Sequence, residues 1–159
     1  MTSYARSFIL LIGACGAQWW WSTHGVVYGV APQLLLVLTV AMAARYGPLR
    51  AMLLGFCWGL FLDFMSARLV GANALLLTIA AYSTGSVRRQ IDLLGLAPQC
   101  LMVFSLTLVY FLMWGLMGMV FLKTFLWVGW ANFLVDPFYN TAVTLLVFVF
   151  LEGWLEPAR

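Results

Sequence analysis

Residues 93–122 form a run of 30 residues without a charged side chain, bounded by Asp92 and Lys123. About 20 apolar residues suffice for a helix to cross a bilayer, so this segment is long enough to span with some tilt. The whole chain is 65% hydrophobic and 8% charged, with a mean hydropathy of +1.01, whereas soluble domains carry about 25% charged residues. The sequence therefore predicts an all-α integral membrane protein, with a single polytopic membrane domain over residues 1–159.

Charged and turn-forming residues divide the chain into about six apolar segments. Residues 124–135 are too few to span a bilayer and are rich in Phe and Trp, which favours an interfacial segment. We then expect Asp136-Pro137 to cap and start the last helix, because Asp suits the N-cap and Pro the first turn. One longer helix kinked at Pro137 is the alternative. The predicted transmembrane helices cover residues 7–21, 32–44, 51–64, 72–86, 98–122 and 137–154.

The placement of basic residues predicts the orientation, because cytoplasmic loops of membrane proteins carry an excess of Lys and Arg. With a cytoplasmic N-terminus, only Arg68 and Lys123 fall in outer loops. We therefore expect an even number of crossings and both termini in the cytoplasm. The net charge of +3 is spread over short loops, which leaves no basic block that could bind nucleic acid. The basic residues expected on the cytoplasmic side are Arg6, Arg45, Arg50, Arg88, Arg89 and Arg159.

The third apolar segment carries two glycines and a carboxylate at intervals of four residues, Gly55, Gly59 and Asp63. Positions i, i+4 and i+8 drift only slowly around one face of a helix. Small residues four apart allow two membrane helices to approach closely, and Gly71 begins a second stretch of small residues just beyond. The pattern predicts a helix-packing or partner-binding face that ends in a charge.

A carboxylate in an apolar membrane segment is costly to hold and by default marks a site with a partner. Asp63 falls near the outer end of its predicted helix, and a negative charge at a helix C-terminus is unfavourable unless something compensates it. Arg68, Asn73 or a donor from another chain would do so. We therefore interpret Asp63 as a structural or interaction residue.

The sequence gives little support to a catalytic or metal site. A membrane aspartyl protease needs two carboxylates that share a proton, and Asp63 and Asp136 are the only candidates on the outer side. The stretch from Asn132 to Asp136 resembles part of the lipoprotein signal peptidases, but their remaining motif is absent. His24 is the single histidine, and the three cysteines form no cluster with metal-ligand spacing. We expect no catalytic residue, no metal and no cofactor.

A solute-binding membrane subunit of a transporter is the alternative function. Aromatic walls could hold an apolar, vitamin-like ligand, and this alternative predicts a central cavity with converging polar groups. Coupled transporters usually place ionisable groups or broken helices near the midplane. Here the charges lie at the ends of the segments, which favours an interaction protein over a transporter.

The sequence resembles the bacterial rod-shape-determining protein MreD family over residues 32–89. The resemblance lies in Gly55-Phe56-x-x-Gly59-x-x-x-Asp63 followed by Gly71, after a preceding Pro-Gln pair at positions 32 and 33. Further along, a tyrosine, a basic doublet and an asparagine stand where the family usually has such residues: Tyr82, Arg88, Arg89 and Asn140.

The resemblance implies a non-enzymatic component of the bacterial inner membrane that helps the cell-wall elongation machinery maintain rod shape. It implies binding to MreC, a single-pass protein, and through MreC to MreB, to the glycosyltransferase RodA and to its transpeptidase partner. It also implies a fold similar to the membrane substrate-binding subunits of energy-coupling-factor transporters. The residues expected to pack helices or to bind the partner are Gly55, Phe56, Gly59, Asp63 and Gly71.

Overall fold

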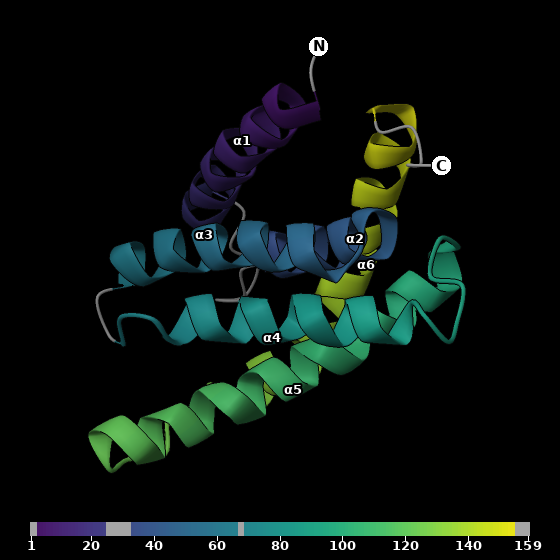
Figure 1. The fold of residues 1–159 in the computed structure, drawn as a ribbon. Coiled ribbons are helices and arrows are strands. Elements are labelled where there is room, and N and C mark those ends of the chain that lie inside the picture. Colours follow the sequence, from purple (N-terminus) through teal and green to yellow (C-terminus); the bar gives the residue numbers. More distant parts are fainter. Residues whose placement is uncertain (1–2, 25–32, 67–68, 155–159) are drawn as a thin grey trace.

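The computed structural model describes residues 3–24, 33–66 and 69–154. Within these ranges the chain forms six helices and no strand (Figure 1), which confirms the prediction of an all-α protein. The helices are α1 (Ser3–His24), α2 (Leu34–Tyr46), α3 (Pro48–Ser66), α4 (Ala72–Val87), α5 (Leu96–Leu122) and α6 (Trp130–Trp154).

Helix α2 is the centre of the bundle, since it contacts each of the other five helices. Residues 35–45 of α2 are all buried. Helices α3 and α4 run side by side as a hairpin, with α5 along the other side of α4 (Figure 1). The start of α1 and the end of α6 lie on the same side of the α3–α4 hairpin, opposite α5 (Figure 1). The 13 residues of α2 give it a length of about 20 Å, shorter than the roughly 30 Å hydrocarbon core.

The bundle places polar side chains inside and large apolar side chains outside. Several fully buried polar residues are threonines that donate to the carbonyl oxygen four residues earlier, such as Thr39 to Leu35 at 2.7 Å. Exposed Leu, Phe and Val side chains cover the outer surfaces of α3, α5 and α6. Such a continuous apolar exterior suits lipid rather than water. Within the part of the chain that the structure describes, three helical segments are long and apolar enough to cross a membrane: Pro48–Met65, Leu96–Leu122 and Trp130–Leu151.

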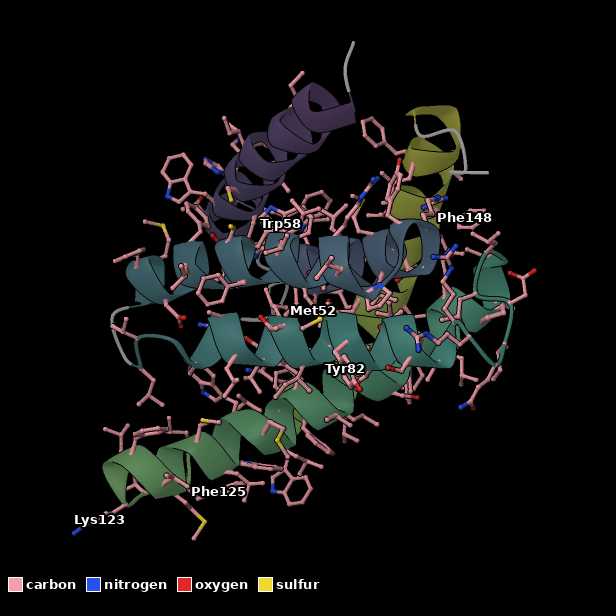
Figure 2. All side chains as sticks on the ribbon, in the orientation of Figure 1. Met52, Trp58, Tyr82, Lys123, Phe125 and Phe148 are labelled. Atoms are coloured by element: carbon pink, nitrogen blue, oxygen red, sulfur yellow. The ribbon has the colours of Figure 1, made fainter. Side chains whose placement is uncertain are left out.

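Basic side chains lie at both ends of the bundle but gather at one. The guanidinium carbon of Arg45 lies 5.5 Å from the centre of the Phe148 ring, and Arg88 lies close to the turn between α2 and α3 at Gly47. Figure 2 shows Phe148 at this end and Lys123 at the opposite end of the bundle, beyond the last turn of α5.

The structure corrects the prediction for the last helix. Helix α6 begins at Trp130 and contains Pro137, so a helix that starts at Asp136-Pro137 after an interfacial segment is wrong. The alternative of one longer helix running through Pro137 describes α6 better. Gly129, with φ +91°, precedes the helix, and the Phe133 N–H donates to its carbonyl oxygen at 3.0 Å to close the first turn. Pro137 is the eighth residue of α6 and lies in its third turn. A proline at such a position removes one backbone hydrogen bond, and its ring crowds the carbonyl oxygen four residues earlier, which favours a kink.

The turn between α5 and α6 folds back onto α5. A Cβ atom at Gly115 would lie 2.4 Å from the Phe125 ring, and one at Gly118 would lie 2.5 Å from the Leu126 side chain. These two glycines therefore leave room for the turn to pack. Pro32, Arg68 and Arg159, which also entered the predictions, lie outside the described residues.

Candidate functional site

The glycine face of α3 packs directly against α4. A Cβ atom at Gly59 would lie 2.2 Å from the Ala74 Cα atom, and one at Gly55 would lie 3.0 Å from the Leu77 carbonyl oxygen. Real Cβ atoms do not approach a backbone as closely as the first of these distances. The hairpin therefore exists at this spacing because position 59 has no side chain, as expected for small residues between membrane helices.

At the opposite end of the hairpin, α3 and α4 also pack closely. A Cβ atom at Gly85 on α4 would lie 2.5 Å from the Cβ atom of Pro48, the first residue of α3. Gly85 was not among the predicted packing residues, because it stands alone on its helix without a second glycine four residues away. Both ends of the α3–α4 contact thus depend on a missing side chain.

Asp63 is fully buried and accepts four hydrogen bonds from the start of α4. Its Oδ2 atom accepts from the N–H groups of Gly71 at 2.9 Å and Ala74 at 3.1 Å. Its Oδ1 atom accepts from the Asn73 N–H at 3.0 Å and from the Asn73 Nδ2 at 2.9 Å. The carboxylate thus satisfies three backbone donors that an α-helix leaves without a partner at its N-terminus.

This arrangement explains how the negative charge of Asp63 is tolerated near the end of α3. A carboxylate near the C-terminus of α3 is unfavourable there, but the N-terminus of α4 carries the positive end of its helix dipole. Gly71, the N-cap residue of α4, has no side chain with which to cap the helix. Asp63 supplies the cap from the neighbouring helix. Of the side chains considered, Asn73 donates to the carboxylate, whereas Arg68 lies outside the described residues. The geometry assigns Asp63 a structural role between two helices.

Gly71 itself adopts the left-handed conformation, with φ +93° and ψ −12°. A Cβ atom there would meet no described atom within 4 Å, so the requirement for glycine comes from the backbone and not from crowding. The conformation turns the Gly71 N–H toward Asp63, which links the turn to the cap.

Gly71→Ala is expected to lower stability by about 1–2 kcal/mol, the cost of a left-handed backbone for a residue with a side chain. The measurement is thermal unfolding of the purified protein in detergent. Gly95→Ala is the matched control, because Gly95 is also a helix N-cap but has an ordinary φ of −74°. Equal melting temperatures for the two variants would contradict the role given to the Gly71 backbone.

Phe56 does not share the buried face of the two glycines. Its side chain is 48% exposed and lies on the outer side of α3, with Leu53 and Phe64 also exposed on that helix. The structure therefore brings together Gly55, Gly59, Asp63 and Gly71 at the hairpin and leaves Phe56 outside it.

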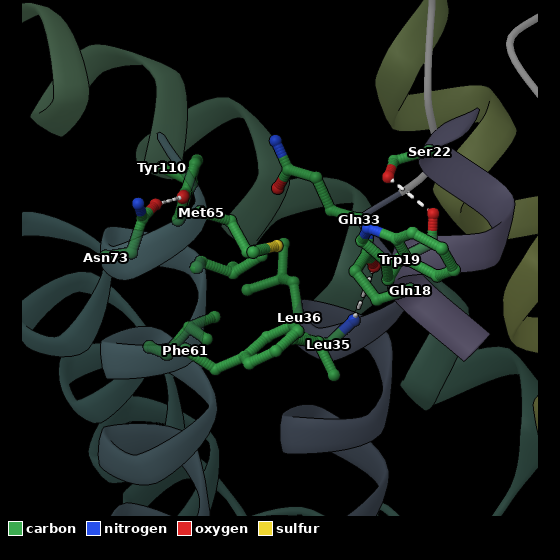
Figure 3. A pocket seen from close by; sticks show the side chains of 12 residues that line it. Gln18, Trp19, Ser22, Gln33, Leu35, Leu36, Phe61, Met65, Asn73 and Tyr110 are labelled. Carbon is green, nitrogen blue, oxygen red and sulfur yellow. Dashed lines mark hydrogen bonds between the residues drawn. The ribbon is translucent and has the colours of Figure 1, made fainter. Parts of the chain in front are cut away.

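A second polar contact ties the hairpin to α5. The Tyr110 hydroxyl donates to the Asn73 Oδ1 atom (Figure 3). Asn73 thereby joins Asp63 on α3 to Tyr110 on α5. Sequence reasoning missed Tyr110, although a hydroxyl group in the middle of a 27-residue apolar helix usually has a hydrogen-bond partner.

Asn140 caps the N-terminus of α2 as Asp63 caps that of α4. It is fully buried in α6, and its Oδ1 accepts from the N–H of Gln33, the N-cap residue of α2, at 2.8 Å. Its Nδ2 atom donates to the Thr107 hydroxyl on α5 at 3.1 Å. The Gln18 side chain on α1 adds an acceptor 3.4 Å from the Leu35 N–H. Side chains from other helices thus satisfy the N-termini of both α2 and α4.

His24 and Asp136 are the other ionisable side chains considered as candidates. His24 stacks on Trp20 within α1, with 5.2 Å between ring centroids, and its Nδ1 atom lies 3.1 Å from the Thr23 hydroxyl. Asp136 is buried near the start of α6, and its Oδ1 atom has no hydrogen-bond partner among the described residues.

Comparison with protein families places the chain in one of them. The model of the rod shape-determining protein MreD matches residues 4–156, nearly the whole chain. Comparison with curated proteins and with solved structures gave no match. The match extends well beyond the segment that carried the resemblance in the sequence and includes Asn140 and Asp136 on α6. The chain therefore belongs to the MreD family of rod shape-determining proteins.

Proposed function

We propose that this chain is a non-enzymatic component of the bacterial inner membrane that binds MreC and helps organise peptidoglycan synthesis during elongation. Membership of a shape-determining family carries the proposal, and that family is one of membrane proteins without known enzymatic activity. The chemistry of the hairpin agrees with it, because donors of the chain itself surround the Asp63 carboxylate. The MreB filament, RodA and its transpeptidase partner would be reached through MreC.

We propose further that all six helices cross the membrane with both termini in the cytoplasm. The gathering of Arg45 and Arg88 at one end of the bundle supports this orientation, because basic residues favour the cytoplasmic side. The α3–α4 turn with its Asp63 cap would then face the periplasm, where the large part of MreC lies. A likeness to the membrane subunits of energy-coupling-factor transporters belongs to the same proposal.

The glycines and Asp63 would serve MreC binding indirectly, by fixing the hairpin. Helix α4 already occupies the face of Gly55 and Gly59. The outer side of α3 remains available, with Phe56 at 48% and Leu53 at 64% exposure. We propose that the membrane helix of MreC packs along this outer side.

Phe56→Ala is expected to reduce the MreC that co-purifies with the tagged protein, because large aromatic side chains are frequent anchors of interfaces. The loss should be at least about fivefold if Phe56 contributes roughly 1 kcal/mol. The measurement is a pull-down from membranes, quantified against the amount of tagged protein. Val120→Ala on α5, which also removes an exposed apolar side chain (73% exposed), is the control.

Two outcomes would separate the parts of this proposal. If Phe56→Ala recovers as much MreC as the wild type, the outer side of α3 is excluded as the binding surface. Failure of the wild-type protein to retain MreC at all would overturn the proposed function.

A further inference from the structure

A cavity of about 320 Å³ lies between α1, α2, α3, α4 and α5, near the end of the bundle that carries the α3–α4 turn (Figure 3). This volume is at the lower end of the range of small-molecule sites, roughly 300–1,000 Å³. Its walls combine apolar side chains with uncharged polar ones. The polar residues are Gln18, Ser22, Gln33, Asn73 and Tyr110.

Gln33 presents a polar group that the protein itself leaves without a partner. Its Oε1 atom is buried and accepts no hydrogen bond from the described residues. Figure 3 shows the Gln33 amide extending into the cavity, between Tyr110 and Trp19. A buried polar atom without a partner is costly, and a ligand that brings a hydroxyl or an amide donor would remove that cost.

The cavity favours an uncharged polar group. Its described lining contains no Lys, Arg, His, Asp or Glu, so a phosphate or a carboxylate would have no counter-charge there. The buried Asp63 carboxylate lies directly behind Asn73 and would repel an anion. The amide and hydroxyl groups that face the cavity match hydroxyl groups of a ligand instead.

The polar cavity continues into an apolar groove between α1 and α3. Trp19, Phe61 and Met65 line both, and the groove extends along α1 past Cys15 and Gly16. A Cβ atom at Gly16 would meet no described atom within 4 Å, so the groove is open at this point. A polar chamber joined to an apolar groove matches the shape of a molecule with a polar head and an alkyl chain.

We propose that this site binds a neutral membrane lipid, with a hydroxyl-bearing head in the polar cavity and an acyl chain in the groove between α1 and α3. The head donates a hydrogen bond to the Gln33 Oε1 atom and contacts the wall formed by Asn73 and Tyr110. The acyl chain lies over Gly16 and replaces bulk lipid at the same surface. This inference goes beyond the proposed binding of MreC and does not depend on it.

The test uses the full-length protein in phosphatidylcholine nanodiscs, with bound lipid counted by native mass spectrometry. The probes are monooleoylglycerol, phosphatidylglycerol with oleoyl chains, and free glycerol, each added separately. We expect retention of monooleoylglycerol above the other two. Gln33→Leu should lower that retention by about fivefold, the factor expected for one lost hydrogen bond.

Gly16→Leu and Gly13→Leu form a matched pair that locates the acyl chain. Both glycines lie on α1, and a Cβ atom at either meets no described atom within 4 Å. Gly16 lines the groove beside α3, whereas Gly13 lines a separate groove between α1 and α6. Gly16→Leu should lower monooleoylglycerol retention at least as much as Gln33→Leu, and Gly13→Leu should leave it unchanged.

Four results would overturn the proposal. Equal retention by Gly16→Leu and the wild type would exclude the groove. A loss of monooleoylglycerol retention with Gly13→Leu alone would place the lipid on the other side of α1. Preferential retention of phosphatidylglycerol would exclude an uncharged head. Retention of glycerol as strong as that of monooleoylglycerol would make the ligand a free solute and remove the acyl chain from the site.

Discussion

Gly59→Ala is expected to destabilise the protein even though it adds a single methyl group. The new Cβ atom would lie 2.2 Å from the Ala74 Cα atom and 2.4 Å from its backbone nitrogen, so the two helices must separate. Overpacking of this kind costs about 1–3 kcal/mol. It also shifts the start of α4 away from Asp63, which weakens the cap. In an uncrowded helix the same substitution stabilises by roughly 0.5–1 kcal/mol.

A Gly→Ala substitution is expected to destabilise the protein at a crowded site and to stabilise it at an open one. A glycine at an open site therefore provides a clear control. Gly13→Ala, on α1, meets no described atom within 4 Å and should be as stable as the wild type or more so. Gly55→Ala should lie between the two, since its nearest contact is 3.0 Å from the Leu77 carbonyl oxygen. Melting temperatures in one detergent provide the comparison. A melting temperature for Gly59→Ala equal to that for Gly13→Ala would contradict the close packing of α3 on α4.

Much of the fold follows from the sequence because the bilayer imposes a simple rule on it. Long runs without charge predict helices, and the first five predicted segments correspond to α1–α5 with ends shifted by a few residues. The rule failed at α6, where Asp136 was taken to mark the end of an apolar segment. Asp136 lies inside α6 and is buried. The boundary before α6 comes earlier, at Gly129, whose backbone has a positive φ.

The sequence also identified the glycine face and the carboxylate but not what they contact. Two glycines four residues apart are a local pattern, whereas the surface that receives them depends on the neighbouring helix. The cap of α2 shows the same limit. Asn140 and Gln33 are 107 residues apart, and no local pattern in a single sequence indicates such a pair. Polar residues in apolar helices were visible as candidates, but their partners required the fold.

Asp63→Leu is expected to cause a large loss of stability. It removes the acceptor for the N–H groups of Gly71, Asn73 and Ala74 and for the Asn73 side chain. Removing an N-cap alone costs about 0.5–2 kcal/mol, and hydrogen bonds to a charged group contribute about 1.5–3 kcal/mol each. We therefore expect a loss of at least about 2 kcal/mol. Asp63→Asn should be intermediate, because its amide keeps one acceptor oxygen but turns donor hydrogens toward other donors.

Thermal unfolding in detergent measures this series, with Asp92→Asn as the control. Asp92 also accepts from a backbone N–H, that of Leu94 at 2.9 Å, but it is exposed. Its substitution should have little effect, since water replaces the lost hydrogen bond. Asp63→Asn and Asp92→Asn with the same melting temperature would contradict the buried cap.

A double-mutant cycle with Asn73→Ala separates the cap of the helix from the side-chain contact. If Asp63 acts only through the Asn73 side chain, Asp63→Leu should add nothing to Asn73→Ala. If it mainly satisfies the N-terminus of α4, most of its effect should persist, because the three backbone donors remain in Asn73→Ala. We expect the second result, with a coupling energy smaller than the effect of Asp63→Leu alone. Asp63 would then stabilise the hairpin chiefly through the backbone of α4, which explains why a carboxylate is tolerated in an apolar helix.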